Sequence, residues 1–375
     1  MKKFLIWFCV LIILGLAGWL VWEVEQPYQG YRGSQIVTIH PGSSAQDIAQ
    51  TLVDRGVLAY QLPFLARYGI GKERHRTLKA GEYQFDRPLS PADVYWKLAR
   101  GEVYLHSVVI PEGSDRFDMG RIFAAAIGVN PTDFLAATAR ADLVRDLDPK
   151  APSLEGYLFP DTYLLPRAAP VTEIVRTMLA RFRQVAQQKL HLSLNPAPPN
   201  LHEVMTLASL VEKETPNPAE RAMIAGVFAR RLERGMPLQC DPTVIYALRL
   251  NQGFPNLPSG APSHDDLAVN SSYNTYVHAG LPPGPICSPG EASIQAALHP
   301  APGDALYFVS NHHGAHYFAN TLEEQNRNVN RYRRELKENS EAPSSSPPST
   351  AAAKKETHEK TRGHQAKKHA GNPQE

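Results

Sequence analysis

The N-terminal segment contains the feature that most limits how this chain can fold. From Phe4 to Trp22 the sequence FLIWFCVLIILGLAGWLVW has no charged residue, and a helix of about 20 apolar residues is long enough to cross the hydrocarbon core of a bilayer. Two lysines precede this run, and Glu23 and Glu25 follow it. Because positive charges favour the cytoplasmic side, the pattern predicts a single-pass anchor with residues 1–3 in the cytoplasm and the rest of the chain outside.

A cleavable signal peptide is the competing interpretation of this segment. The apolar core of a signal peptide is shorter and ends in a cleavage site of small residues, whereas this run continues into WLVWEVEQ. Trp19 and Trp22 instead lie where aromatic side chains gather at a membrane interface. The sequence therefore favours an uncleaved anchor over residues 4–22, followed by a linker over residues 23–34.

The rest of the chain is long and apolar enough for more than one folded unit. Its 375 residues are 43% hydrophobic and 20% charged, which is typical of two or more domains. The net charge of +2 is too small to argue for nucleic acid binding, and no basic stripe with interleaved aromatic residues supports it. Residues 338–375 are rich in Ser, Pro, Ala, Lys and His, so a disordered basic tail is expected there.

Residues 35–104 predict a small module of strands and helices. QIVTIHPGSSAQDIAQTLVDRGVL indicates a strand, a Pro-Gly turn and a helix capped by Ser44, with Asp47 three residues on. A second helix is expected from Pro91 to Arg100, between a serine before it and a glycine after it. The opening strand and helix resemble the start of a LysM glycan-binding module. An ordinary strand and helix unit without glycan binding is the alternative.

Residues 105–337 predict a larger and mainly helical unit. An apolar strand in HSVVIPEG leads into a turn and a helix, and the mostly helical stretch 115–190 is broken by the loop APSLEGYLFPDTYLLP. Two short strands are expected in ALYFVSNHHGAHYFAN, and a last charged helix is expected over residues 323–337. The predicted fold class is therefore α+β.

One helix of this larger unit ends in two acids. It begins after Asn200, a favourable cap residue, and ends in SLVEKETPNP, residues 209–218. On a helical wheel Glu212 and Glu214 lie at opposite borders of the buried face, with Lys213 pointing to solvent between them. A carboxyl desolvated there would have a raised pKa, as a general acid at neutral pH requires. Periodicity cannot choose between the two glutamates, and solvated acids are the ordinary alternative.

Three loops carry polar and aromatic side chains that an ordinary core does not need. They are EGYLFPDTY (155–163), QCDPTVIY (239–246) and YNTYVHAGLPPG (273–284). Rings for stacking and amides for hydroxyl groups are features of a sugar-binding cleft, although each segment alone is also compatible with an ordinary loop. The histidines of NHHGAH (311–316) lie in a predicted turn without a nearby acid or cysteine, so neither a metal site nor a cofactor is expected.

Together these motifs point to one family. LEGYLFPDTY, LASLVEKET, LQCDPTVIY, YNTYVHAGLPPGPICSPG and HYFANTLEEQN, in this order behind a membrane anchor, resemble the YceG-like family of endolytic murein transglycosylases. The resemblance extends to about Lys337. It implies an inner-membrane protein whose catalytic domain, with a lysozyme-like fold, lies in the periplasm and acts on nascent peptidoglycan strands. It also suggests contact with penicillin-binding proteins or other wall-synthesis enzymes.

The resemblance further implies roles for individual residues. Glu212, the first glutamate of VEKET, is the implied catalytic acid: it protonates the β-1,4 bond between N-acetylmuramic acid and N-acetylglucosamine, and then deprotonates the C6 hydroxyl of the same muramic acid to give a 1,6-anhydro end. The expected substrate-binding residues are Gln239, Asp241, Tyr273, Asn274, Tyr276 and Glu155. Tyr273 or Asn274 would orient the N-acetyl group. Cys240 and Cys287 lie inside two of the motifs and would form a disulfide near the cleft, with two free thiols as the alternative.

Two other functions stay open at this point. A muramidase would use water activated by Asp161, Glu155 or Asp241, in keeping with the second carboxylate of most glycoside hydrolases. A non-catalytic scaffold would bind glycan through the small module and reach partners through the tail. The mass of the products distinguishes the first alternative, because hydrolysis adds water. The variant Glu212→Gln distinguishes the second, because it is expected to abolish cleavage and spare binding.

Overall fold

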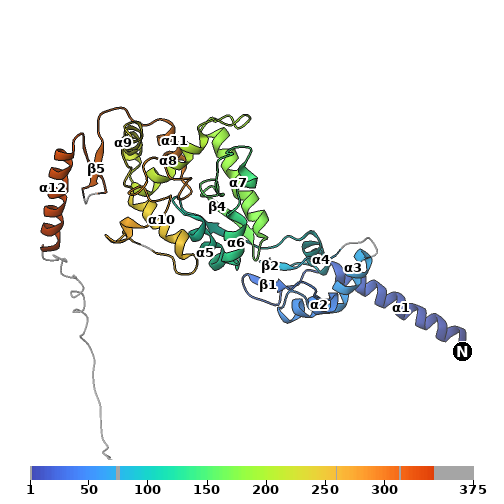
Figure 1. The fold of residues 1–375 in the computed structure, drawn as a ribbon. Helices are drawn as coiled ribbons and strands as arrows, with labels where there is room; N and C mark the ends of the chain where they lie inside the picture. Colours follow the sequence, from blue (N-terminus) through green and yellow to red (C-terminus); the bar gives the residue numbers. More distant parts are fainter. Residues whose placement is uncertain (1, 73–76, 259, 312–313, 342–375) are drawn as a thin grey trace, which may run out of the picture.

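The chain folds as three successive parts (Figure 1). The computed structural model describes residues 2–72, 77–258, 260–311 and 314–341. Helix α1 (Lys2–Glu25) comes first, a small unit follows, and a large unit begins at strand β3 (Leu105–Val109). Of the expected disordered tail, residues 342–375 lie outside the described residues, whereas the residues before them continue the last helix.

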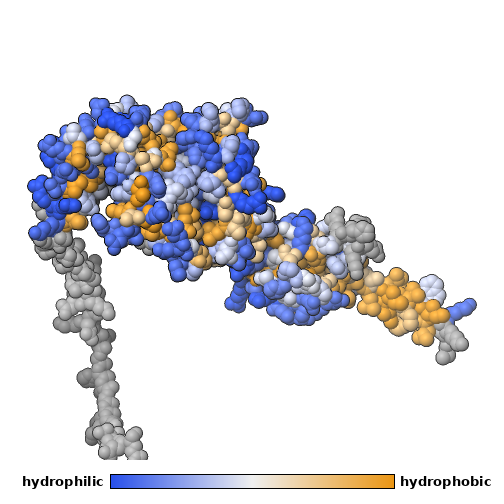
Figure 2. Space-filling model, viewed as in Figure 1, coloured by the Kyte–Doolittle hydropathy of each residue, from blue (hydrophilic) through white to orange (hydrophobic). Residues whose placement is uncertain are grey.

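Helix α1 meets the physical requirements of a membrane span. Its residues Lys3–Glu25 reach a mean hydropathy of 2.7, and none of this apolar stretch is buried inside the protein. Large side chains such as Phe4, Trp7 and Leu11 are exposed along it. Figure 2 shows this helix as an apolar surface, in contrast to the mixed surface of the folded units. The helix is long and apolar enough for single-pass anchoring.

The small unit is a two-stranded sheet covered by helices. Strand β1 (Gln35–Ile39) pairs antiparallel with β2 (Gly81–Phe85), so that Gln35 lies opposite Phe85 and Ile39 opposite Gly81. The helices are α2 (Ala45–Asp54), α3 (Gln61–Lys72) and α4 (Pro91–Arg100). Alternate strand residues and one face of each helix form a core of their own, which includes Val37, Leu52, Phe64, Tyr83, Tyr95 and Leu98.

The predicted helix ends of this unit are confirmed. Ser44 and Asp47 form a capping box in which the serine side chain accepts from the Asp47 backbone N–H and the aspartate side chain accepts from the serine N–H. Ser90 and Asp93 form the same arrangement at the start of α4. Gly101 ends α4 in the left-handed conformation, with φ 70°.

The large unit is mainly helical, with two antiparallel strand pairs. Its helices are α5 (Arg116–Ile127), α6 (Pro131–Thr138), η1 (Asp142–Val144), α7 (Val171–Gln188), α8 (Leu201–Glu214), η2 (Pro218–Glu220), α9 (Arg221–Glu233), α10 (Asp241–Gln252), η3 (Asp266–Ala268), α11 (Glu291–Leu298) and α12 (Leu322–Glu341). Strand β3 pairs with β4 (Thr162–Pro166), and β5 (Tyr307–Ser310) pairs with β6 (His316–Ala319). The expected hairpin and last helix are therefore present, and α12 runs to Glu341 rather than to residue 337.

Strand β4 corrects the expectation of a loop over residues 151–166. Tyr163 and Leu165 are buried and their neighbours in the strand are not, which is the alternation of a strand with one face on a core. The partner strand β3 lies more than 50 positions earlier, with Val109 opposite Thr162. Local sequence could not reveal a pairing over that distance.

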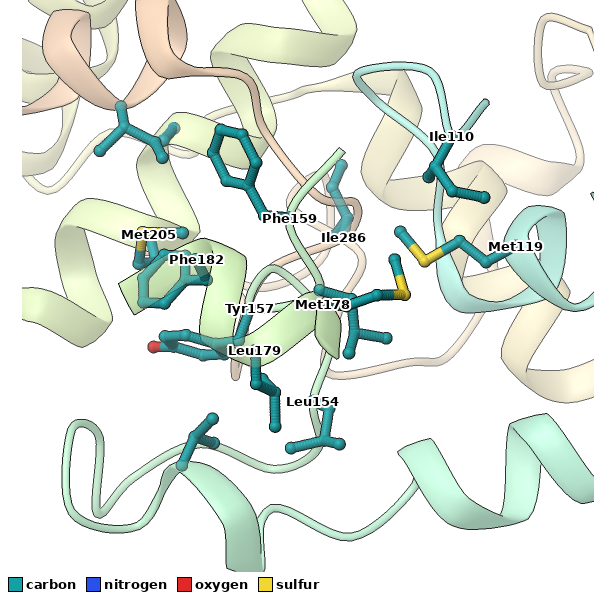
Figure 3. Close-up of a cluster of buried hydrophobic side chains, with 14 of the residues drawn as sticks. Ile110, Met119, Leu154, Tyr157, Phe159, Met178, Leu179, Phe182, Met205 and Ile286 are labelled. Carbon is teal, nitrogen blue, oxygen red and sulfur yellow. The ribbon is translucent and has the colours of Figure 1, made fainter. Parts of the chain in front are cut away.

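The core of the large unit surrounds α8. Tyr157 and Phe182 pack edge to face with ring centroids 5.3 Å apart, and Met205 of α8 lies beside them (Figure 3). Leu210 and Val211 in the last turns of α8 are fully buried. Each such side chain stabilises the fold by about 1.5–3 kcal/mol through burial, so the end of α8 is held firmly in place.

The two ends of α8 differ in how well the sequence predicts them. Asn200 precedes the helix but makes no side-chain capping bond, so the expected cap is absent. Its backbone has ψ 15° rather than the extended value that a capping side chain needs. At the other end Thr215 leaves the helix in an extended conformation, and Asn217 Oδ1 accepts from the Ala219 N–H at 3.1 Å to start η2.

Candidate active site

A cavity of about 680 Å³ lies at the C-terminal end of α8. The start of α10, the loop before it, the β5–β6 hairpin and residues of α9, α12 and the Tyr276 loop also line it. This volume is in the usual range for small-molecule sites. The polar residues on its wall include Glu214, Arg231, Gln239, Asp241, Tyr276 and His316. The cavity thus brings together three of the expected substrate-binding residues, Gln239, Asp241 and Tyr276, with the second of the two glutamates.

Among the described residues, Glu214 is one of two acids on the wall of this cavity, with Asp241. Burial is the largest influence on its carboxyl and, with the nearby charge of Asp241, raises the pKa from 4.5 to about 7. The Cys240 thiol, which donates a hydrogen bond to the carboxyl, and the charge of Arg231 act in the opposite direction. A carboxyl with a pKa near 7 can both donate and accept a proton at neutral pH.

Asp241 and Tyr276 form a second polar group on the same wall. The Tyr276 hydroxyl donates to Asp241 Oδ1 at 2.5 Å. Burial and this hydrogen bond raise the pKa of Tyr276 well above its ordinary value, so the phenol stays protonated and can remain a donor. Asp241 begins α10, and its exposed side chain is open to a ligand.

The loop that carries Gln239 is strained and tightly held. Gln239 has φ 51°, a left-handed conformation that is uncommon for residues other than glycine and tends to occur at functional sites. Its N–H donates to Thr275 O at 3.2 Å, and the Cys240 N–H donates to Thr275 Oγ1 at 3.0 Å. Thr243 Oγ1 donates to Cys240 O at 2.6 Å. These bonds fix Gln239 on the cavity wall and the Cys240 thiol against Glu214.

Two further polar residues of the wall, His316 and Arg231, were not expected from the sequence as substrate-binding residues. His316 Nδ1 lies 2.7 Å from Glu220 Oε2, and its backbone N–H donates to Glu220 Oε1 at 2.8 Å. Arg231 donates to Leu306 O at 2.7 Å and to Leu238 O at 2.8 Å, which joins the hairpin to the Gln239 loop. The NHHGAH motif was the only sequence signal for His316, and it was considered there only as a metal ligand; His312 and His313 lie outside the described residues.

Glu212, the acid implied by the family motif, lies in a different environment. Its side chain is only 6% exposed and forms an ion pair with Arg221 at 3.2 Å. Its second oxygen accepts from the Gly290 N–H at 2.9 Å. These contacts join the end of α8 to the starts of α9 and α11, and Glu212 is not on the wall of the cavity. Of the two glutamates, Glu214 therefore lies on the wall of this cavity and Glu212 does not.

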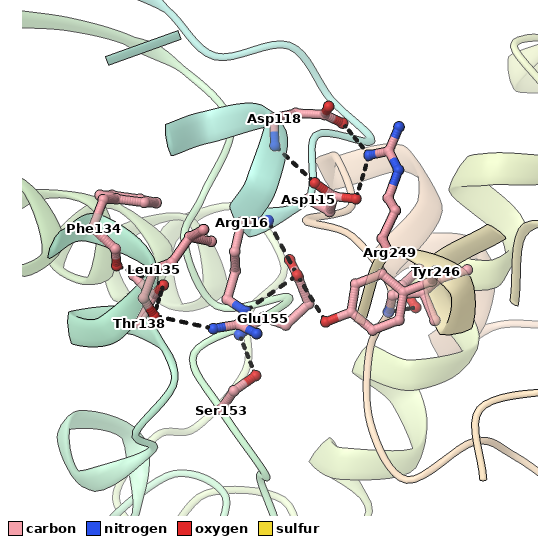
Figure 4. Close-up of polar contacts among 12 residues, drawn as sticks. Asp115, Arg116, Asp118, Phe134, Leu135, Thr138, Ser153, Glu155, Tyr246 and Arg249 are labelled. Atoms are coloured by element: carbon pink, nitrogen blue, oxygen red, sulfur yellow. Dashed lines mark hydrogen bonds and ion pairs between the residues drawn. The ribbon is translucent and has the colours of Figure 1, made fainter. Parts of the chain in front are cut away.

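Glu155, expected at the cleft, is instead in the interior (Figure 4). It is 1% exposed, and its Oε2 accepts from the Arg116 N–H and from the Tyr246 hydroxyl, both at 3.1 Å. Burial and the charge of Asp115 raise its pKa to about 8. Asp161, the other acid of that loop, pairs with Arg181 at 2.6 Å. These contacts give both acids structural roles.

Tyr273 and Asn274 are also placed away from the cavity wall. The Asn274 amide donates to Leu267 O at 3.0 Å and to Val269 O at 2.9 Å, and its oxygen accepts from the Tyr276 N–H at 3.0 Å. The side chain thus shapes the loop that presents Tyr276. Tyr273 is 9% exposed and packs on Tyr246, with ring centroids 5.1 Å apart.

The expected disulfide is not formed. Cys240 and Cys287 are both free and buried. Each thiol has its own partner along α8, because Cys240 donates to Glu214 and Cys287 donates to Ser209 O at 3.3 Å. Burial, the largest cause, raises the pKa of both thiols, which keeps them protonated and weakly reactive.

The site as a whole defines a class of protein. One half-buried carboxyl with a pKa near neutrality shares a polar cavity with an amide, a second acid and a tyrosine. Such an arrangement is chemically capable of general acid–base catalysis on a ligand rich in hydroxyl groups. Residues 37–331 match the YceG-like family, and this chain belongs to that family.

Relatives and a solved structure agree with this membership. An endolytic murein transglycosylase of Bacillus subtilis (strain 168) is 30% identical over 315 residues, covering 79% of this chain and 84% of the relative. One of Streptococcus pneumoniae (strain D39) is 32% identical over 327 residues, and the match covers 78% of this chain but only 57% of that longer relative. A 2.6 Å crystal structure of a yceG-like protein from Listeria monocytogenes is 31% identical with a TM-score of 0.52, covering 79% of this chain and 99% of that chain.

Proposed function

We propose that this protein is a membrane-anchored lytic transglycosylase that cuts peptidoglycan strands internally, with Glu214 as its catalytic acid and base. The names of its relatives, endolytic murein transglycosylases at 30% and 32% identity, support the reaction class. Glu214 is assigned as the catalytic residue because it lies on the cavity wall and has a pKa of about 7.

In the first step the protonated Glu214 donates to the glycosidic oxygen between N-acetylmuramic acid and N-acetylglucosamine. The bond from C1 of the muramic acid to this oxygen breaks, and positive charge develops at C1. In the second step the Glu214 carboxylate accepts the proton of the C6 hydroxyl on the same sugar. The C6 oxygen bonds to C1, which closes a 1,6-anhydro ring and returns Glu214 to its protonated form without consuming water.

The neighbouring side chains support this cycle. The carboxylate of Asp241 can stabilise the positive charge at C1 electrostatically, while its hydrogen bond from Tyr276 holds it in place. The Gln239 amide, fixed by the strained loop, is suited to hydrogen bonds with sugar hydroxyls or an N-acetyl group. Because the nucleophile belongs to the substrate, a second catalytic carboxylate is not required.

A muramidase is the second candidate, and Asp241 is the observation that favours it. Of the acids considered for activating water, Asp241 alone is on the cavity wall, whereas Glu155 and Asp161 are engaged by Arg116 and Arg181. A water molecule between Asp241 and C1 would give hydrolysis with a free reducing end.

The parts outside the cavity define where the enzyme would work. The anchor α1 would keep it at the inner membrane with the catalytic unit in the periplasm, close to nascent strands and to penicillin-binding proteins. The order of strand, two helices and strand in the small unit supports a LysM-like module that holds glycan. The large unit, with its acid at the end of a helix, is in keeping with a lysozyme-like fold. Cleavage in this place would terminate strand elongation.

The mass of the products tests this proposal. Full-length protein in detergent is incubated with purified, uncrosslinked peptidoglycan strands, and the new ends are identified by mass spectrometry. A transglycosylase leaves 1,6-anhydro ends, which lack one water relative to a reducing end. Products with only reducing ends would show that the protein is a muramidase instead. Binding of strands without any cleavage would support the non-catalytic scaffold.

A further inference from the structure

A second cavity adjoins the site described above. It has a volume of about 320 Å³ and shares Asp241 with the Glu214 cavity. Its wall includes the apolar side chains of Pro242, Ile245 and Ile286 and the charged Lys213. Because Lys213 and Glu214 are consecutive residues of α8, their side chains diverge by about 100° around the helix. Because the two cavities share Asp241, one extended ligand can occupy both of them and contact both residues.

Two cationic side chains line this second cavity, Arg249 and Lys213, and they differ in whether an acid already pairs with them. Arg249 is neutralised, since its guanidinium lies 2.5 Å from Asp115 and 3.0 Å from Asp118 (Figure 4). Lys213 donates to the Gly113 carbonyl at 3.1 Å, and the structure describes no ion pair for it among the residues it covers. An apolar floor with an unpaired ammonium group beside it fits a ligand that has methyl groups and a carboxylate.

In a peptidoglycan strand the N-acetyl groups of the sugars supply methyl groups but no carboxylate, whereas the lactyl-peptide substituent of muramic acid supplies both. Its lactyl group and the first alanine of the stem peptide have methyl groups, and the second residue of the stem carries a free carboxylate when it is D-isoglutamate. We propose that this second cavity binds the lactyl-peptide stem of the muramic acid whose ring lies at Glu214, with Lys213 pairing with that carboxylate. This inference rests on the proposed function for the substrate class.

The test compares two substrates that differ in one charge. Uncrosslinked strands with D-isoglutamate in the stem are compared with strands in which amidation has converted it to D-isoglutamine. The full-length protein in detergent should have a kcat/KM about fivefold higher on the charged strands, the upper range for a partly exposed ion pair. Lys213→Met should reduce this ratio to about one, whereas Lys213→Arg, which retains the charge, should keep the preference.

A matched control and a binding measurement separate this proposal from the proposed reaction. Lys150→Met removes another exposed lysine, which is paired with Glu203 at 2.8 Å on a different cavity, and it should keep the fivefold ratio. In the Glu214→Gln background, affinities for fragments with the two stems should show the same ratio even without cleavage. Equal affinities and equal rates on the two stems, or a ratio that Lys213→Met leaves unchanged, would overturn the stem site. If the wild-type protein discriminated between the two stems in binding but cleaved neither strand, the stem site would be supported and the proposed reaction overturned.

Discussion

The raised pKa of Glu214 should make the stability of the protein depend on pH in a way that one substitution removes. The carboxyl has a pKa of about 7 in the folded protein against an ordinary value of 4.5. Since a tenfold change in proton affinity corresponds to about 1.4 kcal/mol, this difference corresponds to about 3 kcal/mol. Between these two pH values the folded state holds the proton more tightly than the unfolded state, so stability falls as pH rises through this window.

The substitution Glu214→Gln leaves a neutral side chain at every pH. The free energy of unfolding of the wild type minus that of the variant should therefore fall by about 3 kcal/mol between pH 4 and pH 8. The variant is thus more stable relative to the wild type at pH 8 than at pH 4. The comparison isolates Glu214 from other buried acids such as Glu155, which titrate in both proteins. Urea unfolding followed by circular dichroism, in detergent and at several pH values, measures this difference. A difference that stays constant with pH would refute the argument that burial raises this pKa.

Three further predictions concern the surroundings of Glu214. Glu212→Ala should destabilise the fold by about 2–3 kcal/mol, because among the described residues it leaves the buried Arg221 with the more distant Glu112 as its one acidic partner. A thermal unfolding scan measures this loss, and an unchanged midpoint would contradict the structural role of the pair. Cys240→Ala removes a hydrogen bond that lowers the pKa of Glu214, so the fall of kcat/KM at alkaline pH should shift to higher pH. Cys240→Ser, which can still donate, should shift it less. Identical pH profiles of kcat/KM for the variants and the wild type would argue against the contact. Alkylation of the unfolded, unreduced protein should modify all 3 cysteines, and a mass that shows only one modified cysteine would indicate a disulfide after all.

Features that depend on neighbouring residues in the sequence were predictable. The capping boxes at Ser44 and Ser90 rest on contacts over three residues, and the hairpin and last helix follow from local composition and periodicity. The expected Asn200 cap is absent because its backbone, at ψ 15°, does not have the extended conformation of a capping residue. Strand β4 was missed because its burial pattern has meaning only beside β3.

The site was predictable as a set of segments but not as a geometry. Gln239, Asp241 and Tyr276 reach the cavity wall, whereas the side chain of Asn274, from the same motif as Tyr276, is used to shape the loop. The choice between the two glutamates depends on distant residues, because Gly290 engages Glu212 from 78 positions away. A helical wheel does not include contacts between distant residues. The family resemblance implied Glu212 as the catalytic acid, whereas we propose Glu214 because it lies on the cavity wall.

The most direct test of the central claim compares Glu214→Gln with Glu212→Gln on purified peptidoglycan strands. Both variants are checked for a native circular dichroism spectrum, and the rate at which 1,6-anhydro ends form is measured by mass spectrometry. We expect Glu214→Gln to lose activity by at least about a thousandfold, in line with the loss of a general acid and base, and Glu212→Gln to keep a substantial part of it. A folded Glu212→Gln that forms no product, beside an active Glu214→Gln, would contradict the assignment of the catalytic acid.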